Sequence, residues 1–503
     1  GASFQLIKSL KTFHAAEQYC VSHGGHLASI HSAQENQAVY NLCHAVGKNC
    51  WIGFEKRGSS YSWTDGSTSS YKNFISGEPD NWHGLEGCAV LKVDSRYHGQ
   101  WSDQACDASY DHSYFVCKLQ NTGGSQTGNV HSTQSHGSQS SASKLSIRGN
   151  HFMYNGHRIF LSGINKAWEQ YAYDFGNNQY SNVRSKYNHV LQQIQQSGGN
   201  SVRIWVHIDG QSSPKFDGSG HVTATDNSGT LISDLRTLLH DARSHNVFVF
   251  LTLWNGAAKS NSHNRLDGLI KDTNKLQSYL NHALIPMVKA LKNEPALGGW
   301  DIMNEPEGEM KPDIYSSDPC HDTRILHNSG AGWEGKLYTA QEIQRFVNWQ
   351  ADAIKRTDPS ALVTVGAWSG RVNTDHFGYH NYYKDSCLVK SGGKQMGTLS
   401  FYQVHSYAWQ GHFGSDSPFK ILLKKHKFSD LGLNKPLVIG EYREKDGGGM
   451  SINQLYDYAY NNGYAGGWGW SQTDGNMANL MKGMQHVKNY HNQAQGGTVK
   501  ISI

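Results

Sequence analysis

Two glutamates stand where short apolar runs meet loop residues. Glu305 ends Gly-Trp-Asp-Ile-Met-Asn-Glu at 299–305, and Glu441 ends Pro-Leu-Val-Ile-Gly-Glu at 436–441. Such runs are typical of strands that are buried on both faces. Barrel enzymes build their active sites at the carboxyl ends of these strands. A pair of carboxyl groups brought together there is the minimum equipment for breaking a glycosidic bond.

Other predicted strand ends carry polar or aromatic side chains as well. The sixth strand runs Gln-Val-His-Ser-Tyr at 403–407, and the eighth runs Gly-Gly-Trp-Gly-Trp at 466–470. A lone Asn-Glu-Pro triplet occurs in loops by chance, but Glu, His and Tyr that converge on one barrel mouth are a strong signal. The candidates at the first three strands are Trp168, Arg203, His207 and Trp254.

Strand-like and helix-like segments alternate over about 350 residues, which is the length of an enlarged TIM barrel. The predicted strands are 159–163, 201–206, 247–253, 298–303, 362–366, 399–404, 437–439 and 465–469, and the predicted helices include 182–196, 231–244, 275–292, 340–356 and 452–461. Eight β-then-α units predict a (β/α)8 barrel with insertions. An open doubly wound sheet is the alternative. It would need a phosphate-binding glycine loop after its first strand, and Gly-Ile-Asn-Lys-Ala-Trp at 163–168 is not one.

A polar segment precedes the barrel. Residues 121–144 are mostly Ser, Gly, Gln, Thr and His, with almost nothing to bury, so this segment is predicted to be a flexible tether. A chain of this kind spans on the order of 25–30 Å. We therefore predict a small domain at 1–120, a linker at 121–145 and a barrel domain at 146–503.

Charge and hydropathy exclude two kinds of partner. The net charge is +4 on 503 residues, with acidic and basic side chains interspersed, and no basic block suited to nucleic acid is present. No apolar stretch approaches the roughly 20 residues of a membrane span, so no membrane partner is expected.

The cysteines indicate the compartment. Six of the eight cysteines lie within the first 117 residues, and an even count in a short segment predicts disulfides and an oxidising environment. The first residue is Gly, as expected if a signal peptide has been removed. We predict a secreted, extracellular protein, with digestive fluid as one setting; a cytosolic protein with free thiols is the alternative. Cys320 and Cys387 lie in the insertions after the fourth and fifth strands, and we expect them to form a disulfide rather than two unpaired thiols.

Residues 147 to about 490 resemble glycoside hydrolase clan A, family five. The resemblance is specific at Asn304-Glu305-Pro306, at His405-x-Tyr407 and at Gly440-Glu441. The tracts at 300–308 and 253–255 look most like the invertebrate endo-β-1,4-mannanases of that family. The resemblance implies retaining hydrolysis of internal bonds in mannan, glucomannan or galactomannan. It leaves an endo-β-1,4-glucanase as the alternative, and a non-catalytic carbohydrate-binding or adhesion protein as a more distant one.

The same resemblance assigns roles to single residues. Glu305 would be the general acid/base and Glu441 the nucleophile. Asn304 would hold the sugar 2-OH, Arg203 would pair with the nucleophile, His405 and Tyr407 would arrange the hydrogen bonds, and Trp470 would be the floor beneath the sugar. Trp168 and Trp254 are equally consistent with sugar platforms and with packing. His207 is expected to contact the residues that bind the sugar, and not the sugar itself.

The physical chemistry agrees with these roles. A retaining glycosidase needs carboxyl groups about 5–5.5 Å apart, one protonated and one ionised. We expect Arg203 to lower the pKa of Glu441. We expect burial and a neighbouring negative charge to raise that of Glu305. The mechanism requires no metal or organic cofactor.

Residues 1–120 resemble a C-type lectin domain. The matching tracts are 15–20, 24–30, 51–54, 101–103 and 115–117. The resemblance implies the disulfides Cys20–Cys117 and Cys88–Cys106, and leaves Cys43–Cys50 as an additional local pair.

A calcium site in this domain is a further implication of the resemblance. Its ligands would be Glu78, Asp80, Glu86 and Asp103, whose carboxylates suit Ca²⁺. Ser102 replaces the expected amide, which weakens or removes one ligand. The bound glycan would contain galactose or mannose, and Trp82 slightly favours galactose because its ring could stack on that sugar. A calcium-free module that binds a protein or a surface is the alternative.

Overall fold

The computed structural model divides the chain into two compact units, Gly1–Gln139 and Ser140–Ile503. It describes residues 2–57, 59–81, 86–107, 113–120, 144–258, 263–335, 337–408 and 426–494. Nearly all of the predicted linker therefore lies outside the described residues, and the predicted domain boundaries stay predictions.

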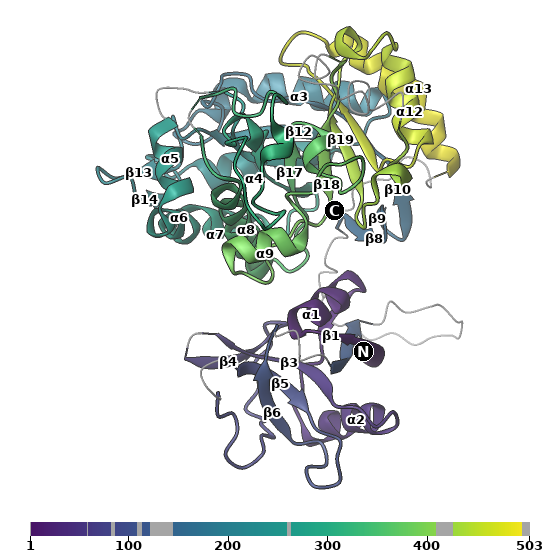
Figure 1. The fold of residues 1–503 in the computed structure, drawn as a ribbon. Helices are drawn as coiled ribbons and strands as arrows, with labels where there is room; N and C mark the ends of the chain where they lie inside the picture. The colour runs from purple at the N-terminus through teal and green to yellow at the C-terminus, as the bar shows by residue number, and fades with distance from the viewer. Residues whose placement is uncertain are drawn as a thin grey trace. The chain divides into compact units, whose positions relative to one another are not determined.

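The described residues of the N-terminal unit form a seven-stranded sheet with two helices (Figure 1). Its strands are β1 (Ala2–Lys11), β2 (Gly25–Leu27), β3 (Cys50–Arg57), β4 (Ser60–Trp63), β5 (Glu86–Leu91), β6 (Trp101–Ala105) and β7 (Ser113–Gln120), and its helices are α1 (Phe13–Ser22) and α2 (Ala33–His44). Strands β1 and β7 pair antiparallel, so the first and last strands of the unit lie side by side. Disulfides join Cys20 to Cys117, Cys43 to Cys50 and Cys88 to Cys106, which are the pairs expected above.

The second unit contains the predicted barrel. Its eight strands are β11 (Leu161–Asn165), β12 (Ser201–Ile208), β15 (Phe248–Asn255), β16 (Leu297–Asn304), β17 (Val363–Ala367), β18 (Tyr402–His405), β19 (Leu437–Glu441) and β20 (Gly466–Gly469). Neighbouring strands are parallel, and β11 pairs with β20 to close the ring. All carboxyl ends therefore meet at one mouth, which confirms the fold class.

Helices surround the barrel (Figure 1). In the part of the chain that the structure describes, they are α3 (Tyr180–Gln196), α4 (Leu231–Ser244), α5 (His263–Lys271), α6 (Thr273–Tyr279), α7 (Ile285–Leu291), α8 (Ala340–Thr357), α9 (Asp385–Gly392), α12 (Ile452–Asn461) and α13 (Met477–Ala494). A π-helical turn at Leu280–Leu284 joins α6 to α7, so the single helix predicted at 275–292 is interrupted. Helix α8 starts with a capping box in which Thr339 and Glu342 exchange hydrogen bonds.

The amino end of the barrel is covered by a small antiparallel sheet. Strands β8 (Ser146–Arg148), β9 (His151–Tyr154) and β10 (His157–Ile159) form it, and the ring of Phe152 packs 5.1 Å from that of Phe401. The sheet ends at Ile159, and the first barrel strand begins at Leu161, two residues after the predicted start. With this end covered, the mouth at the carboxyl ends is left to carry the site.

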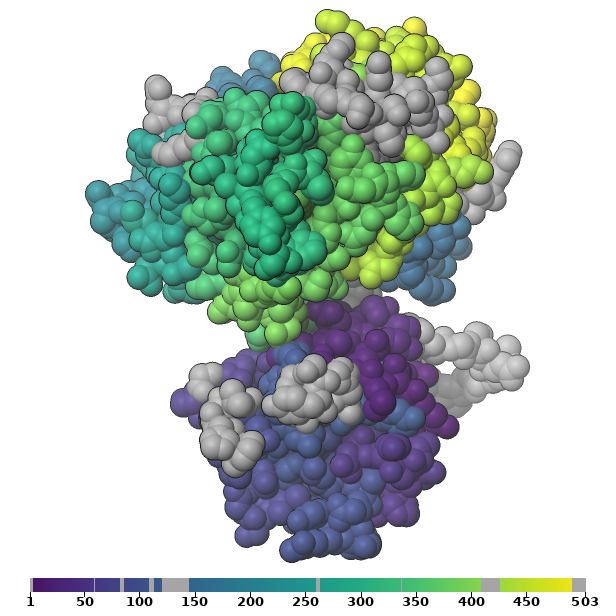
Figure 2. Space-filling view, viewed as in Figure 1, coloured from purple at the N-terminus to yellow at the C-terminus, as the bar shows by residue number. Residues whose placement is uncertain are grey.

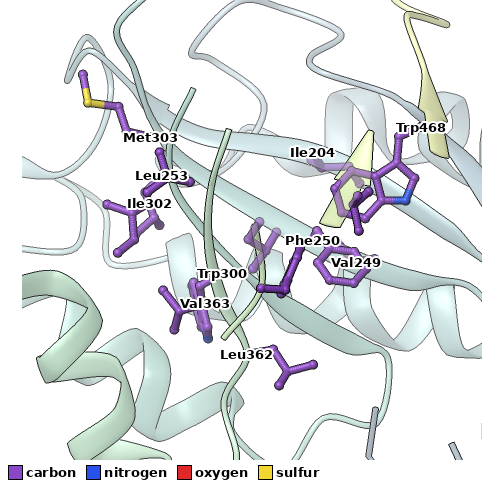
Figure 3. Close-up of a cluster of buried hydrophobic side chains, with 14 of the residues drawn as sticks. Ile204, Val249, Phe250, Leu253, Trp300, Ile302, Met303, Leu362, Val363 and Trp468 are labelled. Carbon is purple, nitrogen blue, oxygen red and sulfur yellow. The ribbon is translucent and has the colours of Figure 1, made fainter. Parts of the chain in front are cut away.

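Side chains from different strands fill the barrel core. Figure 3 shows part of this buried apolar cluster, in which Phe250 and Trp468 lie together and Ile204 and Trp300, next in sequence to the inward-pointing Arg203 and Asp301, face the surrounding helices. The rings of Phe250 and Trp468 lie 4.6 Å apart, and the Trp468 indole N–H donates to Ser201 Oγ at 2.9 Å. Of the two tryptophans at the end of β20, Trp468 is thus buried in the core, which leaves Trp470 to face the mouth.

Long insertions follow β16 and β17. The insertion between β16 and α8 lies on the surface of the barrel unit (Figure 2), where Tyr315 and Trp333 are exposed. Cys320 in this insertion is disulfide-bonded to Cys387 in the next, as expected.

Candidate active site

Glu305 and Glu441 meet at the mouth of the barrel. Glu305 directly follows β16, and Glu441 is the last residue of β19. His405 Nδ1 lies 2.6 Å from Glu305 Oε2 and 3.1 Å from Glu441 Oε2. One oxygen of each glutamate and one His405 nitrogen all lie within 4.8 Å of one another. Carboxyl groups whose oxygens approach this closely are nearer than the roughly 6.5–9.5 Å typical of inverting glycosidases, which suits a retaining pair.

The backbone at Glu305 is unusual. Its φ of 41° and ψ of 61° are left-handed, a conformation that residues other than glycine rarely adopt. The Glu305 N–H donates to Gly366 O at 2.7 Å, and the Gly308 N–H donates to Glu305 O at 3.1 Å. A Cβ at Gly256 would lie only 2.6 Å from Glu305 O, so a glycine is needed there. The neighbouring strands thus hold a backbone turn that presents the Glu305 side chain.

Arg203 organises the floor of the site. Its guanidinium is fully buried and donates to Asp301 at 2.8 Å, Glu441 at 2.9 Å, Asn304 at 2.7 Å and Asn165 at 3.1 Å. Asn304 in turn donates to Asn255 Oδ1 at 2.9 Å. The guanidinium therefore fixes both the Glu441 carboxylate and the Asn304 side chain.

Burial dominates the acid–base behaviour of the pair. It raises the pKa of Glu305 to about 7, against the opposing charge of Arg203. Burial also raises the pKa of Glu441, and it outweighs the lowering effects of His405, Arg203 and Tyr407. The expectation that Arg203 would leave Glu441 with a lowered pKa is therefore corrected, although the effect of Arg203 has the expected sign.

Hydrogen bonds distinguish the two carboxyl groups. Glu441 accepts from Arg203 Nη1 at 2.9 Å and from the Tyr407 hydroxyl at 2.8 Å. Glu305 contacts His405, whose pKa burial lowers to about 4, so that its imidazole is neutral near pH 7. Donors stabilise a carboxylate, and Glu441 has more of them, so Glu441 is the more readily ionised.

Three tryptophans form a cluster beside Arg203, the residue that donates to Glu441, and the Arg203 guanidinium lies 5.5 Å from the Trp205 ring. The ring of Trp470 lies 6.1 Å from that of Trp205 and 6.4 Å from that of Trp168, and the Trp470 indole donates to Asp474 at 2.5 Å. Trp168 and Trp470 are half-buried, so part of each ring is open to a ligand. This placement suits the sugar-platform interpretation of both.

Trp254 and His207 point elsewhere. The Trp254 ring is fully buried, and its indole donates to Gln350 on α8 at 2.9 Å. His207 contacts Ser213 at 2.8 Å and Tyr279 at 3.0 Å, and its ring lies 4.8 Å from Trp254. Both side chains therefore pack between the barrel and its helices. The contacts favour the packing interpretation of Trp254, and no contact described for His207 reaches the carboxyl pair.

Sequence reasoning missed several contributors to the site. Asn165, Asp301 and Gln403 form buried hydrogen bonds around Arg203 and His405, and Trp205 completes the tryptophan cluster. Polar residues within otherwise apolar strands were the available signal, at positions 165, 301 and 403.

Three acidic groups also meet in the N-terminal unit. One carboxylate oxygen each from Glu78, Asp80 and Asp103 lie within 4.8 Å of one another, and burial and Asp103 raise the pKa of Glu78 to about 7. The Tyr61 hydroxyl donates to Asp103 at 2.9 Å. Hard oxygen ligands in this arrangement fit Ca²⁺. Glu86, at the start of β5, is not in this group of three, and Trp82 lies outside the described residues.

A parallel barrel with two carboxyl groups meeting at its mouth fits one class of protein, the glycoside hydrolases. Residues 154–493 match the family model for cellulase (glycosyl hydrolase family 5), and residues 9–119 match that for the lectin C-type domain. The mannan endo-1,4-beta-mannosidase of Mytilus edulis is 59% identical over 356 residues, which cover 70% of this chain and 95% of that protein.

A structure and a lectin relative complete the comparison. The X-ray structure of beta-mannanase from the blue mussel Mytilus edulis aligns with a TM-score of 0.68 at 57% identity, covering 72% of this chain and 100% of that one. The C-type lectin lectoxin-Lio1 of Erythrolamprus poecilogyrus is 35% identical over 133 residues, which cover 25% of this chain and 79% of that protein. The chain belongs to glycosyl hydrolase family 5, and it carries an N-terminal C-type lectin domain.

Proposed function

We propose that this chain is an endo-β-1,4-mannanase that cleaves internal mannosidic bonds with retention of configuration. The observation that carries the proposal is the shared contact of Glu305 and Glu441 with His405, which holds the two carboxyl groups at the separation a covalent mechanism needs. The similarity to proteins named mannan endo-1,4-beta-mannosidase supports mannan as the substrate.

The reaction would proceed in two displacements. Glu441 attacks the anomeric carbon while Glu305 donates its proton to the leaving oxygen, which gives a glycosyl ester on Glu441. Glu305, now ionised, then takes a proton from water while the water oxygen bonds to the anomeric carbon, which breaks the bond to Glu441 and releases its carboxylate. The two carboxyl groups and water balance both steps without a metal or organic cofactor.

Other side chains at the mouth would bind the sugar. Arg203 and Tyr407 keep the Glu441 carboxylate charged and oriented through their hydrogen bonds. Asn304, which Arg203 and Asn255 hold in place, would contact the 2-OH of the sugar. Trp470 would support its apolar face, with Trp168 beside it.

Separate assays on mannans and on a glucan test whether the enzyme prefers mannan. Reducing-sugar release is measured on glucomannan, galactomannan and carboxymethylcellulose, with Glu441→Ala as the control. We expect the parent enzyme to release reducing sugar from glucomannan and galactomannan, and Glu441→Ala to release none. Hydrolysis of carboxymethylcellulose alone would instead support the endo-β-1,4-glucanase alternative, which the name of the matching family model raises. An unchanged rate in Glu441→Ala would remove Glu441 as the nucleophile.

The lectin domain would retain the enzyme near a glycan surface. A Ca²⁺ ion held by Glu78, Asp80 and Asp103 would bind vicinal hydroxyl groups of galactose or mannose. Retention of the full chain on galactose and mannose resins, with and without EDTA, tests this role. The variant Glu78→Gln should lose retention while Glu305→Gln keeps it. Retention that EDTA leaves intact would exclude calcium.

The compartment is inferred from covalent chemistry. Four disulfides are present, and an oxidising, extracellular environment is where such bonds persist. Within the described residues, no helix has both the length and the apolar character needed to cross a bilayer. Secretion is tested by mass spectrometry of the native protein from extracellular fluid, where all eight cysteines should resist alkylation before reduction.

A further inference from the structure

Gln403 lies directly beneath the carboxyl pair. It is fully buried on β18, two residues before His405, so the two side chains share the inner face of the strand. Gln403 Nε2 donates to Asp301 Oδ2 at 3.1 Å, and Gln403 Oε1 lies 3.3 Å from His405 Nε2. The carboxamide therefore links an ionised carboxylate to the imidazole that contacts Glu305.

Asp301 determines which way this carboxamide faces. Its carboxylate also accepts from Arg203 Nε at 2.8 Å, Thr252 Oγ1 at 3.1 Å and the Gly366 N–H at 3.0 Å. An ionised carboxylate accepts hydrogen bonds and donates none, so the NH₂ group of Gln403 must point toward Asp301. Its carbonyl oxygen then points toward His405 Nε2. Because that oxygen also only accepts, His405 Nε2 must carry a hydrogen.

The neighbouring strand makes room for Gln403. A Cβ at Gly440, directly before Glu441, would lie 2.0 Å from Gln403 Oε1 and 2.5 Å from its Cδ. No side chain fits at position 440 while the carboxamide keeps this position. The orientation of Gln403 is thus fixed by packing as well as by hydrogen bonds.

The groups around the imidazole allow one tautomer. Glu305 and Asp301 face it from the β16 segment, Glu441 from β19 and Arg203 from β12, and Tyr407 follows two residues after the end of β18. Burial keeps His405 neutral, so a hydrogen on Nε2 leaves Nδ1 with a lone pair, 2.6 Å from Glu305 Oε2. Glu441 already has donors in Arg203 and Tyr407. A protonated Glu305 is the remaining group that can donate to Nδ1.

We propose that Gln403, oriented by Asp301, is a positioning residue that locks His405 in its Nε2–H tautomer, so that Nδ1 accepts a hydrogen bond from the protonated acid Glu305. A lone pair at this position stabilises the neutral carboxyl group and disfavours the carboxylate. The opposite tautomer would donate to the carboxylate and favour ionisation. The tautomer therefore sets the sign of the influence of His405 on Glu305. This inference rests on the proposed role of Glu305 as acid/base.

Neutron diffraction tests the tautomer without reference to activity. Crystals of the full chain are equilibrated in D₂O at about pH 5, below the pKa of Glu305. A deuteron on His405 Nε2, none on Nδ1 and one on Glu305 Oε2 are expected. A deuteron on Nδ1, with or without one on Nε2, would overturn the proposal. Because the map reports only proton positions, it gives this answer even if Glu305→Gln shows that another group is the acid.

The pH dependence of kcat/KM on mannopentaose tests the consequence. Gln403→Met removes the acceptor at Nε2, which frees Nδ1–H to donate to Glu305, so the alkaline limb should move down by about one pH unit. Gln403→Glu is the matched control. Its neutral carboxyl group can donate to Asp301 and accept from Nε2–H, so the limb should return toward that of the parent enzyme. An alkaline limb that does not move in a folded Gln403→Met, or that moves equally in both variants, contradicts the proposal. Should Gln403→Met fail to fold, the neutron map and Gln403→Glu decide.

Discussion

Glu305 and Glu441 occupy one buried site but receive different sets of hydrogen bonds. Arg203 and Tyr407 both donate to Glu441, whereas Glu305 contacts the neutral ring of His405. Burial pushes both pKa values up, and the donors decide which group ionises first. Two chemically identical carboxyl groups can therefore take the roles of acid and nucleophile at the same pH.

The pKa of Glu305 predicts the alkaline side of the pH profile. As the proposed acid, Glu305 must be protonated, and its pKa is about 7, so kcat/KM on mannopentaose should fall as pH rises through about 7. The acid limb reports Glu441, whose raised pKa means that activity is lost as pH falls toward it. Steady-state kinetics from pH 4 to 9 on a substrate with a sugar leaving group measure both limbs.

Glu305→Gln isolates the contribution of the acid. It should reduce kcat/KM on mannopentaose by about 10²–10⁴-fold and remove the alkaline limb. The loss should be much smaller on β-mannobiosyl fluoride, because fluoride leaves without a proton. If Glu305→Gln kept the alkaline limb near pH 7, or if kcat/KM fell equally on mannopentaose and on the fluoride, another group would be the acid.

Glu307 predicts a separate effect, on stability. This side chain is fully buried, and burial raises its pKa to about 8. Because its pKa is raised, Glu307 binds its proton more tightly in the folded state than in the unfolded state. Its contribution to stability is therefore complete below its unfolded pKa of about 4.5 and is lost as pH rises to about 8. Glu307→Gln should therefore gain thermal stability over the parent as pH rises through this window, by about 2 °C or more at pH 8. Calorimetry at pH 4.5 and pH 8 measures the difference in Tm between Glu307→Gln and the parent. The same difference at both pH values would contradict this prediction.

The sequence predicted the residues of the site better than their environment. Motif positions placed Glu305, Glu441, Arg203, His405 and Tyr407 together, because parallel strands bring their carboxyl ends to one mouth. A shift of one residue in strand register moves a side chain from the inner to the outer face of the barrel. The sequence does not fix the register at a strand end, so it could not tell on which face Trp254 lies. Long-range partners such as Asp301 and Gln403 follow only from the closed barrel.

At the scale of elements, a charged side chain joins a helix to a sheet in the lectin domain. His14 of α1 is buried between Glu55 of β3 and Asp107, just beyond β6. Burial alone would lower the pKa of His14, but the hydrogen bonds to Asp107 and Glu55 outweigh it and raise the value to about 9. The imidazolium therefore ties three separate segments together near neutral pH.

This contact predicts how the lectin domain responds to pH. A raised histidine pKa contributes stability that is complete below about 6.5 and is lost as pH rises through about 9. His14→Gln should lower the Tm of the lectin transition most at pH 6 and progressively less toward pH 9, while exposed His23→Gln changes it little. Calorimetry of the full chain follows both transitions. A deficit that does not depend on pH would show that His14 acts by packing alone.

The elements themselves were predictable to different degrees. Long strands with continuous apolar runs, such as β12 and β15, coincide closely with their predictions. The sheet β8–β10 was missed because its strands are three or four residues long, too short for a clear alternation. The π-helical turn at Leu280–Leu284 has no local sequence signal that separates it from an α-helix.

At the scale of the molecule, the chain joins two units with different sources of stability. The lectin domain contains three disulfides, two of which join a helix to a strand, and the barrel has a continuous apolar core with one disulfide between its insertions. The composition of 121–144 predicts a tether that leaves each unit folded on its own. A flexible tether raises the local concentration of a catalytic unit near a bound surface without altering its active site.

Cutting this tether tests whether the lectin domain assists the barrel on a solid substrate. With a protease recognition sequence inserted near position 130, cleavage should leave kcat/KM on soluble mannopentaose within about twofold, because all residues proposed for catalysis lie in the barrel. The rate on an insoluble polysaccharide that also carries the lectin ligand should fall, since avidity is lost. The uncut chain and a cut chain carrying Glu78→Gln serve as controls. The cut Glu78→Gln chain should be no slower on the insoluble polysaccharide than the cut parent chain. A fall in the rate on mannopentaose after cleavage would mean that the lectin domain takes part in catalysis. Equal rates on the insoluble substrate before and after cleavage would exclude a targeting role.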